Sequence, residues 1–285
     1  MTVRYAIDVA PLGDLADPVA IVRLAKAAEA AGWDGLSTWD SLGVSMGTVA
    51  ADPFVTLAAV AASTERLRLI LSVAVLPRRR PQLLVQSTGT LDRISGGRLV
   101  LGIGAGADPG DFEAFGEGAP LSERVALMDA ALPVVDRWLR GEAARLDQPG
   151  AAEVAVGPRP LQVPRPPVWF GGMRPGALRR AARWDGWIAL ATSDDGSEMV
   201  LSPDALGEMI GRVNAERAGL GRSDEPFDVA LFARSDLGGA NVAGAYAAAG
   251  ATWWLESLSP MRGSPDELLA VVEAGPPRLP ASAAK

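Results

Sequence analysis

Two kinds of hydrophobic pattern alternate along this chain. Short apolar runs, such as residues 67–75, predict buried strands, and longer segments with apolar residues every three or four positions predict helices. In residues 18–31 the apolar stripe consists of Ile21, Leu24, Ala25 and Ala28. Charged residues occupy the opposite face of this predicted helix, and Gly32 directly after it is typical of a helix end.

Eight strand and helix units follow one another in this way. The predicted strands are 3–9, 35–39, 67–75, 98–103, 168–171, 186–191, 227–234 and 252–256. The predicted helices are 18–31, 53–62, 81–94, 121–140, 175–184, 203–218, 238–249 and 265–274. This alternation is typical of a parallel sheet. Eight units in 285 residues favour an α/β fold that is a single closed (β/α)8 TIM barrel over an open doubly wound sheet.

The period lengthens after the fourth predicted strand. Residues 141–167 are rich in Pro, Gly and Ala, and the strand and helix rhythm resumes directly after them. We therefore expect an insertion on the barrel and not a linker between domains. The prediction is one barrel domain over residues 1–275 and a flexible tail at 276–285.

The composition excludes several kinds of site. The chain has no histidine and no cysteine, so imidazole-dependent triads, thiolate nucleophiles and His- or Cys-based metal sites are excluded. We expect no metal site. The net charge of −7, from 27 basic and 34 acidic residues, argues against a nucleic-acid surface.

Two observations bear on location. No apolar run approaches the roughly 18 residues that a membrane-spanning helix needs. The first five residues lack the charged and apolar regions of a signal peptide. We therefore expect a cytoplasmic protein that does not bind membranes.

Candidate functional residues lie where the predicted strands end, because active sites of such barrels form at the C-terminal ends of the strands. The candidates are Asp8 and residues 39–41, 72–73, 102–108, 170–174, 192–193 and 256–257. Asp8 and Asp40 are suited to hydrogen-bond a ligand or to act as acid or base. Aspartates at strand ends are also common as plain turn residues, so both interpretations stay open.

Residues 102–107 read GIGAGA and formally match the G-x-G-x-x-A form of the dinucleotide-binding fingerprint. That fingerprint needs a helix to start inside it, whereas here Asp108-Pro109-Gly110 follows and breaks the backbone. The glycines fit either a flat ligand that lies against bare backbone or tight packing at a strand end.

Residues 170–176 read FGGMRPG, in which a strand ends in two glycines and a helix begins near Pro175. Backbone N–H groups, the positive helix end and Arg174 together favour a phosphate. A plain turn between strand and helix also tolerates two glycines. Thr192 and Ser193 at the next strand end would add hydroxyl donors to the same anion, or cap the following loop.

A longer set of ordered motifs adds to this picture. The stretch 76–106, LPRRRPQLLVQSTGTLDRISGGRLVLGIGAG, resembles the bacterial luciferase-like flavin oxidoreductase family. Asp52-Pro53, the segment 111–116 and the segment 166–187 fit the same family in order. The resemblance is greatest to an actinobacterial branch in which many members use the 5-deazaflavin coenzyme F-420.

The resemblance implies a (β/α)8 barrel with the flavin ring over the strand ends. Ser72 and Val73 would back the ring, at a peptide bond that is strained and sometimes cis in family members. The implied cofactor-binding residues are Asp8, Ser72, Val73, Gly104, Ala105, Gly106, Gly171, Gly172, Met173, Arg174 and Thr192.

One position departs from the family pattern. Well-studied members have a histidine after the acidic residue that ends the second strand, and Ser41 stands there in this chain. A glutamate that some deazaflavin members carry falls near Ala107 and Asp108. We therefore expect proton transfer to depend on Asp40, Ser41, Asp108 or water.

Three hypotheses about function remain. The first is an oxidoreductase or monooxygenase that uses coenzyme F-420 or FMN on a small organic substrate, with F-420 favoured over FMN. The second is a flavin-binding barrel that has lost its catalytic groups. The third is a barrel enzyme for a phosphorylated metabolite without redox chemistry. A homodimer is the candidate assembly.

Overall fold

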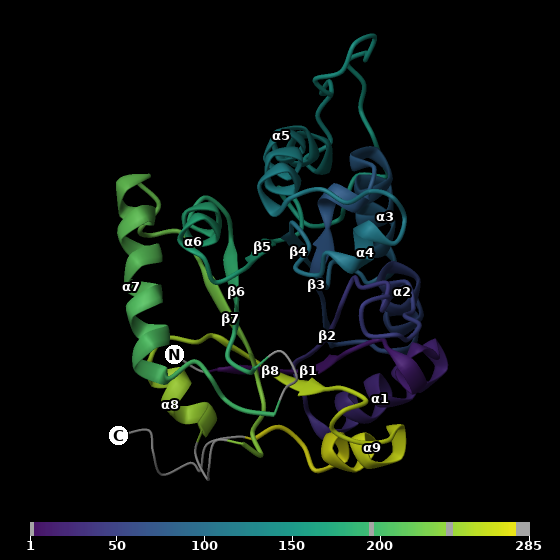
Figure 1. The fold of residues 1–285 in the computed structure, drawn as a ribbon, viewed down its shortest axis with the longest axis vertical. Helices are drawn as coiled ribbons and strands as arrows, with labels where there is room; N and C mark the ends of the chain where they lie inside the picture. The colour runs from purple at the N-terminus through teal and green to yellow at the C-terminus, as the bar shows by residue number, and fades with distance from the viewer. Residues whose placement is uncertain (1–2, 194–196, 238–241, 278–285) are drawn as a thin grey trace.

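The computed structural model describes residues 3–193, 197–237 and 242–277, and its strands form one closed barrel (Figure 1). The strands are β1 (Arg4–Val9), β2 (Gly35–Thr38), β3 (Arg68–Val75), β4 (Leu99–Gly104), β5 (Val168–Gly171), β6 (Gly186–Leu190), β7 (Asp228–Ala233) and β8 (Trp253–Leu258). Each strand pairs in parallel with the next, and β1 pairs with β8 to close the ring. The prediction of an α/β fold with a single (β/α)8 barrel is confirmed.

Helices on the outside of the barrel connect the strands (Figure 1). They are α1 (Pro18–Ala31), α2 (Pro53–Ser63), α3 (Pro81–Ile94), α4 (Gly110–Glu113), α5 (Leu121–Leu139), α6 (Pro175–Ala181), α7 (Pro203–Gly219), α8 (Val242–Ala248) and α9 (Pro265–Glu273). Two short 3-10 helices, η1 (Gly13–Ala16) and η2 (Leu76–Arg78), follow β1 and β3.

Helix starts follow a common rule in this chain. The side chains of Asp17, Asp52, Ser202 and Ser264 accept a hydrogen bond from a backbone N–H in the first turn, and proline comes next in each case. An accepting side chain satisfies an N–H group that the helix leaves open, and proline has no N–H to leave open. Sequence alone therefore located these four helix starts well.

One predicted helix needs correction, one lies partly outside the described residues, and one short helix was not predicted. Helix α6 ends at Ala181 and not at Trp184, because Asp185 turns the chain: its carboxylate accepts hydrogen bonds from the backbone N–H of Val168 and from Arg165. The start of the predicted helix 238–249 lies outside the described residues, and α8 is described from Val242. The one-turn helix α4 was not predicted, since the proline and glycine before it indicated only a break.

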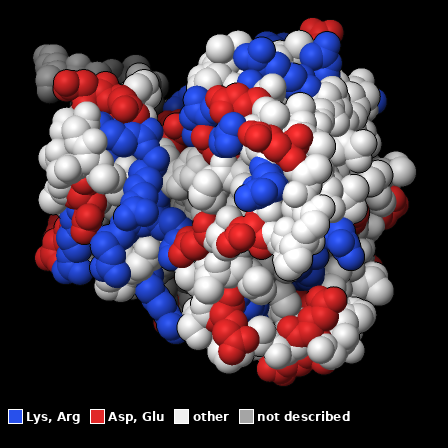
Figure 2. Space-filling model, turned by 90° about the horizontal axis from the view of Figure 1, so that it is seen from above, with Lys and Arg blue, Asp and Glu red and all other residues white. Residues whose placement is uncertain are grey.

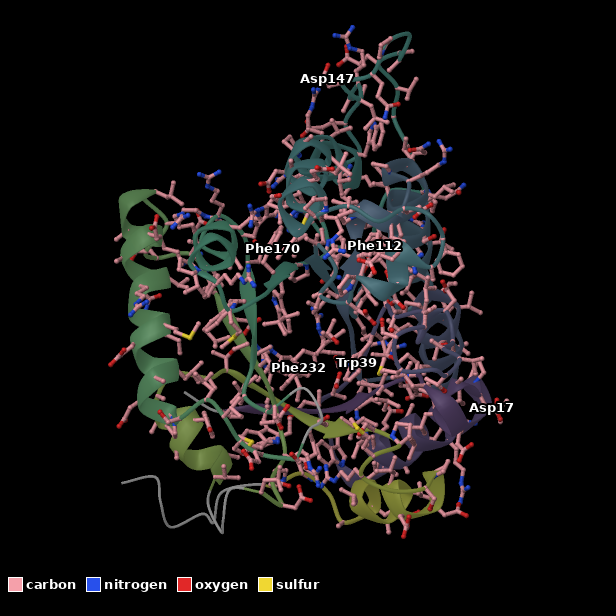
Figure 3. The ribbon with its side chains drawn as sticks, viewed as in Figure 1. Asp17, Trp39, Phe112, Asp147, Phe170 and Phe232 are labelled. Carbon is pink, nitrogen blue, oxygen red and sulfur yellow. The ribbon has the colours of Figure 1, made fainter. Side chains whose placement is uncertain are left out.

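The insertion after β4 was predicted. Its second half, which leads back to β5, packs on the barrel. Asp92 of α3 is buried, and its carboxylate accepts hydrogen bonds from the backbone N–H groups of Leu161 and Gln162 at 2.7 and 3.1 Å. The Trp138 Nε1 group donates to the carbonyl of Val154 at 2.7 Å. Figure 1 shows the loop between these contacts projecting away from the barrel, with Asp147 near its tip in Figure 3.

The interior of the barrel is filled by large side chains. Trp169 of β5 and Trp253 of β8 are almost fully buried, with ring centroids 5.9 Å apart. Phe232 and Val73 pack beside this cluster on the side toward the strand C-termini. The barrel is thus closed below, so a ligand site has to form at the strand ends. No described helix has the length and apolar character that a membrane span needs.

Candidate functional site at the strand ends

Val73 of β3 packs against glycines of β4 and β5. Its Cγ2 atom lies 2.5 Å from where a Cβ would be at Gly104, and its Cγ1 atom 3.0 Å from a Cβ at Gly171. Any side chain at Gly104 would therefore displace Val73. Tight packing, one of the two interpretations of these glycines, explains Gly104, and Val73 itself stays half-exposed above them.

The peptide bond between Ser72 and Val73 is cis, which agrees with the expectation drawn from the family resemblance. The hydroxyl of Ser72 is buried and donates to the carbonyl of Thr38 at 3.2 Å. Ser72 also lies within hydrogen-bonding distance of Ser37 and of the Asp8 carboxyl group, at 2.5 and 3.5 Å. The end of β3 is thus tied to β1 and β2 below Val73.

Asp8 of β1 is fully buried beneath the strand ends. Its Oδ2 atom accepts a hydrogen bond from Nε1 of the half-buried Trp39 at 2.8 Å. Burial raises the pKa of Asp8 from 3.8 to about 7, although hydrogen bonds from Ser37, Trp39 and Ser72 act in the opposite direction. Figure 3 shows Trp39 and Phe232 near the centre of the ring of strands. Asp8 therefore orients Trp39 from below and does not itself reach the surface of the site.

Asp40, which follows Trp39, is held by two arginines. Arg79 donates to its two carboxylate oxygens from Nε and Nη2 at 2.7 and 2.8 Å, and Arg78 Nη2 donates to Oδ1 at 2.8 Å. Burial would raise the pKa of Asp40, but the hydrogen bonds and charges of Arg79 and Arg78 outweigh it and hold the pKa below its ordinary value. Asp40 is therefore ionised near neutral pH and is poorly suited to donate a proton.

Asp111 of α4 extends this network, and sequence reasoning missed it as a site residue. Its Oδ2 atom accepts hydrogen bonds from Arg78 Nη1 at 3.0 Å, from the backbone N–H of Leu42 at 2.7 Å and from the Ser41 hydroxyl at 3.2 Å. Ser41, at the position of the family histidine, is thus a donor to a buried carboxylate. The arginines and Asp111 lie inside the motifs that carried the resemblance, which is the only sequence signal that pointed to them.

Asp108 lies in the loop between β4 and α4 and is half-buried. Its Oδ1 atom accepts hydrogen bonds from the Ser45 hydroxyl at 2.5 Å and from the backbone N–H of Gly110 at 2.9 Å. Ala105 and Gly106 connect it to β4 and are half-buried. Arg124 donates to the carbonyl of Gly106 at 3.2 Å. The structure therefore places Asp108 and Ser41 on one side of the mouth, joined through the loop 42–45.

The loop after β5 forms the opposite side. Gly172 is exposed and has a φ of 128°, which favours glycine, and its carbonyl accepts a hydrogen bond from Trp187 Nε1 at 2.8 Å. The Met173 sulfur accepts from the backbone N–H of Leu190 at 3.3 Å. Thr192 is buried two residues after the end of β6, and Arg174 is exposed.

Among the described residues, some of the groups predicted to bind a phosphate have no partner in this loop. Within the described part of the chain, the backbone N–H groups of Met173 and Arg174 have no hydrogen-bond acceptor, and the Arg174 guanidinium has no ion pair. The seven residues of α6 make the helix-end contribution smaller than the sequence suggested. Backbone donors and Arg174 are therefore the groups that remain for an anion.

The end of β8 is occupied by a separate ion pair. Glu256 is buried, and its carboxylate accepts hydrogen bonds from Arg262 Nη1 at 2.6 Å and from Trp254 Nε1 at 2.7 Å. The hydroxyl of Ser235 donates to the same group at 3.0 Å. These partners give Glu256 a structural role that closes β8 against the loop after β7.

Comparisons with known proteins agree with this geometry. The model of the luciferase-like monooxygenase family matches residues 4–253. An uncharacterized protein of Mycobacterium tuberculosis is 31% identical over 230 residues, which cover 73% of this chain and 74% of that relative.

Two solved structures share the fold. An F-420-dependent secondary alcohol dehydrogenase in complex with an F-420–acetone adduct has a TM-score of 0.78 at 14% identity, over 97% of this chain and 99% of that one. The oxygenating constituent of a 3,6-diketocamphane monooxygenase from Pseudomonas putida, in complex with FMN, has a TM-score of 0.63 at 17% identity, over 82% and 67% of the two chains. Since the family model spans nearly the whole barrel, this chain belongs to the luciferase-like monooxygenase family.

Proposed function

We propose that this protein is an oxidoreductase that binds coenzyme F-420, or in second place FMN, across the strand ends and acts on a small organic substrate. The observation that carries the proposal is Val73, a half-buried apolar side chain that packs on the glycines of β4 and β5 at the strand ends. A flat ring stacks well on such a surface. The two solved structures of this fold named above are complexes with an F-420 adduct and with FMN, which supports a cofactor of the flavin type.

The residues present fit such a cofactor at both ends. A ring needs an apolar platform, which Val73 supplies, and a wall, for which the half-buried Trp39 is suited. A phosphate needs N–H donors and a cation, which residues 172–174 supply. The proposed cofactor-holding set is Val73, Trp39, Gly106, Gly172, Met173 and Arg174.

F-420 is favoured by the family branch and by the cations at the rim. The acidic tail of F-420 would favour cations near the strand ends, and the candidates are Arg174 and the run 78–80. Arg78 and Arg79 are committed to Asp40 and Asp111, as their ion pairs show. The proposal therefore gives the tail to Arg80, which is exposed, and to Arg174.

The cofactor would supply the hydride or oxygen chemistry when bound. The residues of this chain would hold and orient it and manage protons. Asp40 keeps Arg78 and Arg79 in place as a positioning residue, since it is ionised. Proton delivery is assigned to the rim, where Ser41 and Asp108 reach the mouth from one side.

Parallel absorbance titrations of the full chain with F-420 and with FMN test the proposal. We expect one molecule of cofactor per chain and tighter binding of F-420. Arg174→Gln should weaken both cofactors by about tenfold, because a charge-assisted hydrogen bond contributes about 1.5–3 kcal/mol and this site is exposed. Arg80→Gln should weaken F-420 alone. Absence of binding of either cofactor would refute the proposal.

The alternative of a barrel that binds a flavin without turnover follows from the serine at position 41. It is separated from the enzyme by a second experiment. Reduced F-420 is mixed with the protein and a panel of oxidised acceptors, including oxygen, and its reoxidation is followed. Rates equal to the protein-free control with every acceptor, in a protein that binds the cofactor, would favour the alternative.

A further inference from the structure

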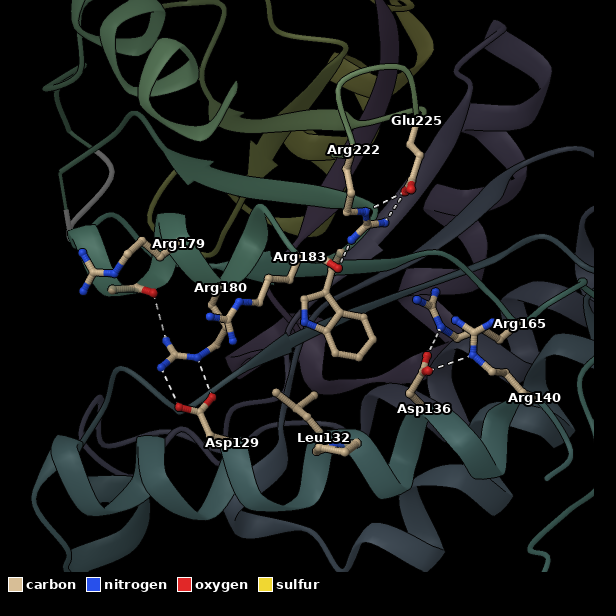
Figure 4. Close-up of a pocket in the computed structure, with 13 residues that line it drawn as sticks. Asp129, Leu132, Asp136, Arg140, Arg165, Arg179, Arg180, Arg183, Arg222 and Glu225 are labelled. Atoms are coloured by element: carbon tan, nitrogen blue, oxygen red, sulfur yellow. Dashed lines mark hydrogen bonds and ion pairs between the residues drawn. The ribbon is translucent and has the colours of Figure 1, made fainter. Parts of the chain in front are cut away.

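A groove on the flank of the barrel is separate from the strand ends. It lies between α5 and α6, has a volume of about 830 Å³ and is lined by thirteen residues (Figure 4). We call it the flank groove: Asp129, Leu132, Pro133, Asp136, Arg140, Arg165, Gly176, Arg179, Arg180, Arg183, Trp184, Arg222 and Glu225. Figure 2 shows basic side chains gathered along one wall of a cleft in the surface.

Ion pairs join the two walls of the flank groove. Arg180 of α6 donates to both carboxylate oxygens of Asp129 of α5, at 2.6 and 2.7 Å. Farther along α5, Asp136 accepts hydrogen bonds from Arg140 at 2.7 Å and Arg165 at 2.5 Å. The Arg180–Asp129 pair joins α6 to α5 and the Arg165–Asp136 pair joins the end of the insertion to α5, whereas Arg140 caps the same helix as Asp136.

The pairing leaves two cations over. Arg222 pairs with Glu225, which is the third acidic residue of the lining. The side chains of Arg179 and Arg183 form no ion pair or hydrogen bond within the described part of the chain. Both are exposed, Arg179 within α6 and Arg183 just past its end. The lining holds six arginines and three carboxylates, and Asp185 beside it pairs with Arg165 and Arg222, so the groove keeps a net positive charge in a chain whose total charge is −7.

An apolar surface lies next to these cations. Trp184 is half-buried in the lining of the groove, and its ring contacts Phe170, with centroids 5.7 Å apart, and the Arg165 guanidinium, 5.1 Å from its centroid. Leu132 and Pro133 of α5 line the facing wall. A fixed aromatic ring beside unpaired guanidinium groups suits a ligand with a flat apolar part and an anionic part.

We propose that the flank groove binds a nucleoside phosphate, with the phosphate on Arg179 and Arg183 and the base against Trp184. The volume lies within the range of 300 to 1,000 Å³, roughly, that is usual for small-molecule sites. Guanidinium groups bind phosphate oxygens through paired N–H donors. The site is independent of the cofactor proposed at the strand ends, because no lining residue belongs to that set.

Isothermal titration calorimetry of the full chain with ADP tests this proposal. Adenosine, which lacks the phosphate, and tripolyphosphate, which lacks the base, are titrated in parallel. We expect one ADP per chain and an affinity at least about tenfold higher than for either fragment. The double variant Arg179→Gln/Arg183→Gln should weaken ADP by about tenfold or more, and Trp184→Leu should reduce ADP binding to that of tripolyphosphate.

A matched control is the double variant Arg145→Gln/Arg212→Gln, which removes two exposed arginines outside the groove. It should bind ADP like the wild type, and the unfolding midpoint of every variant is measured to exclude misfolding. Equal binding of tripolyphosphate and ADP would overturn the proposal, as would absence of binding at millimolar ADP. Loss of ADP binding in the presence of saturating FMN would place ADP at the strand ends and would also overturn it.

Discussion

Asp8→Asn is the substitution that tests the electrostatics of the strand ends most sharply. The neutral amide resembles the protonated carboxyl group and keeps an oxygen that accepts from Trp39 Nε1. In the wild type, a carboxyl group with a pKa of about 7 in the folded state and 3.8 as its ordinary value binds a proton on folding between these two pH values. The contribution of Asp8 to stability is therefore fully present below pH 3.8 and is lost as pH rises from there to about 7.

The magnitude follows from the two pKa values of Asp8. Since one pKa unit is worth 1.36 kcal/mol, ionisation of the buried group costs about 4 kcal/mol above pH 7, and about 2.5 kcal/mol of this appears between pH 5 and pH 8. We expect the free energy of unfolding of Asp8→Asn, relative to wild type, to rise by that amount across this interval.

Urea unfolding at pH 5, 6, 7 and 8 measures the difference between wild type and Asp8→Asn. Asp147→Asn, on the projecting loop, is the control and should show a difference that does not change with pH. A flat difference for Asp8→Asn would show that Asp8 is ionised at every pH, and the account of its burial would be refuted. Trp39→Phe removes a hydrogen bond that lowers the pKa of Asp8. In this variant the pH-dependent loss of stability caused by Asp8 should therefore extend to higher pH than in the wild type.

Two further substitutions address packing and ion pairing. Asp40→Asn leaves Arg79 without a buried carboxylate and should lower the free energy of unfolding by about 3 kcal/mol in urea at pH 7, and an effect below about 1 kcal/mol would contradict the structural role of Asp40. Gly104→Ala places a methyl group 2.5 Å from Val73 and should cost about 1–3 kcal/mol in the same assay, together with weaker cofactor binding in an absorbance titration. Gly211→Ala, where the new methyl group meets open space in α7, is the control and should stabilise by about 1 kcal/mol.

The parts of the fold that depend on local pattern could be predicted from the sequence. The apolar runs gave all eight strands to within a residue or two, and four predicted helix starts coincide with an acidic or hydroxyl residue before a proline in the structure. Helix α6 was predicted too long because Arg183 and Trp184 carry no stop signal. Its true end depends on Asp185, whose partners Arg165 and Val168 come from elsewhere in the chain.

The chemistry of the strand-end aspartates could not be predicted. Asp8 and Asp40 had the same status in the sequence, yet burial raises the pKa of Asp8 and, despite burial, two arginines lower that of Asp40. The difference arises from Arg78 and Arg79, which stand 38 and 39 residues away from Asp40. Only the parallel pairing of β2 with β3 brings these residues together, so no local pattern reveals it.

A crystal structure of the protein soaked with F-420 tests the central claim most directly. The account predicts density for the deazaflavin ring over Val73 and beside Trp39, with the phosphate at the backbone of residues 172–174 and in contact with Arg174. A ring located elsewhere, or a phosphate bound away from this loop, would contradict it.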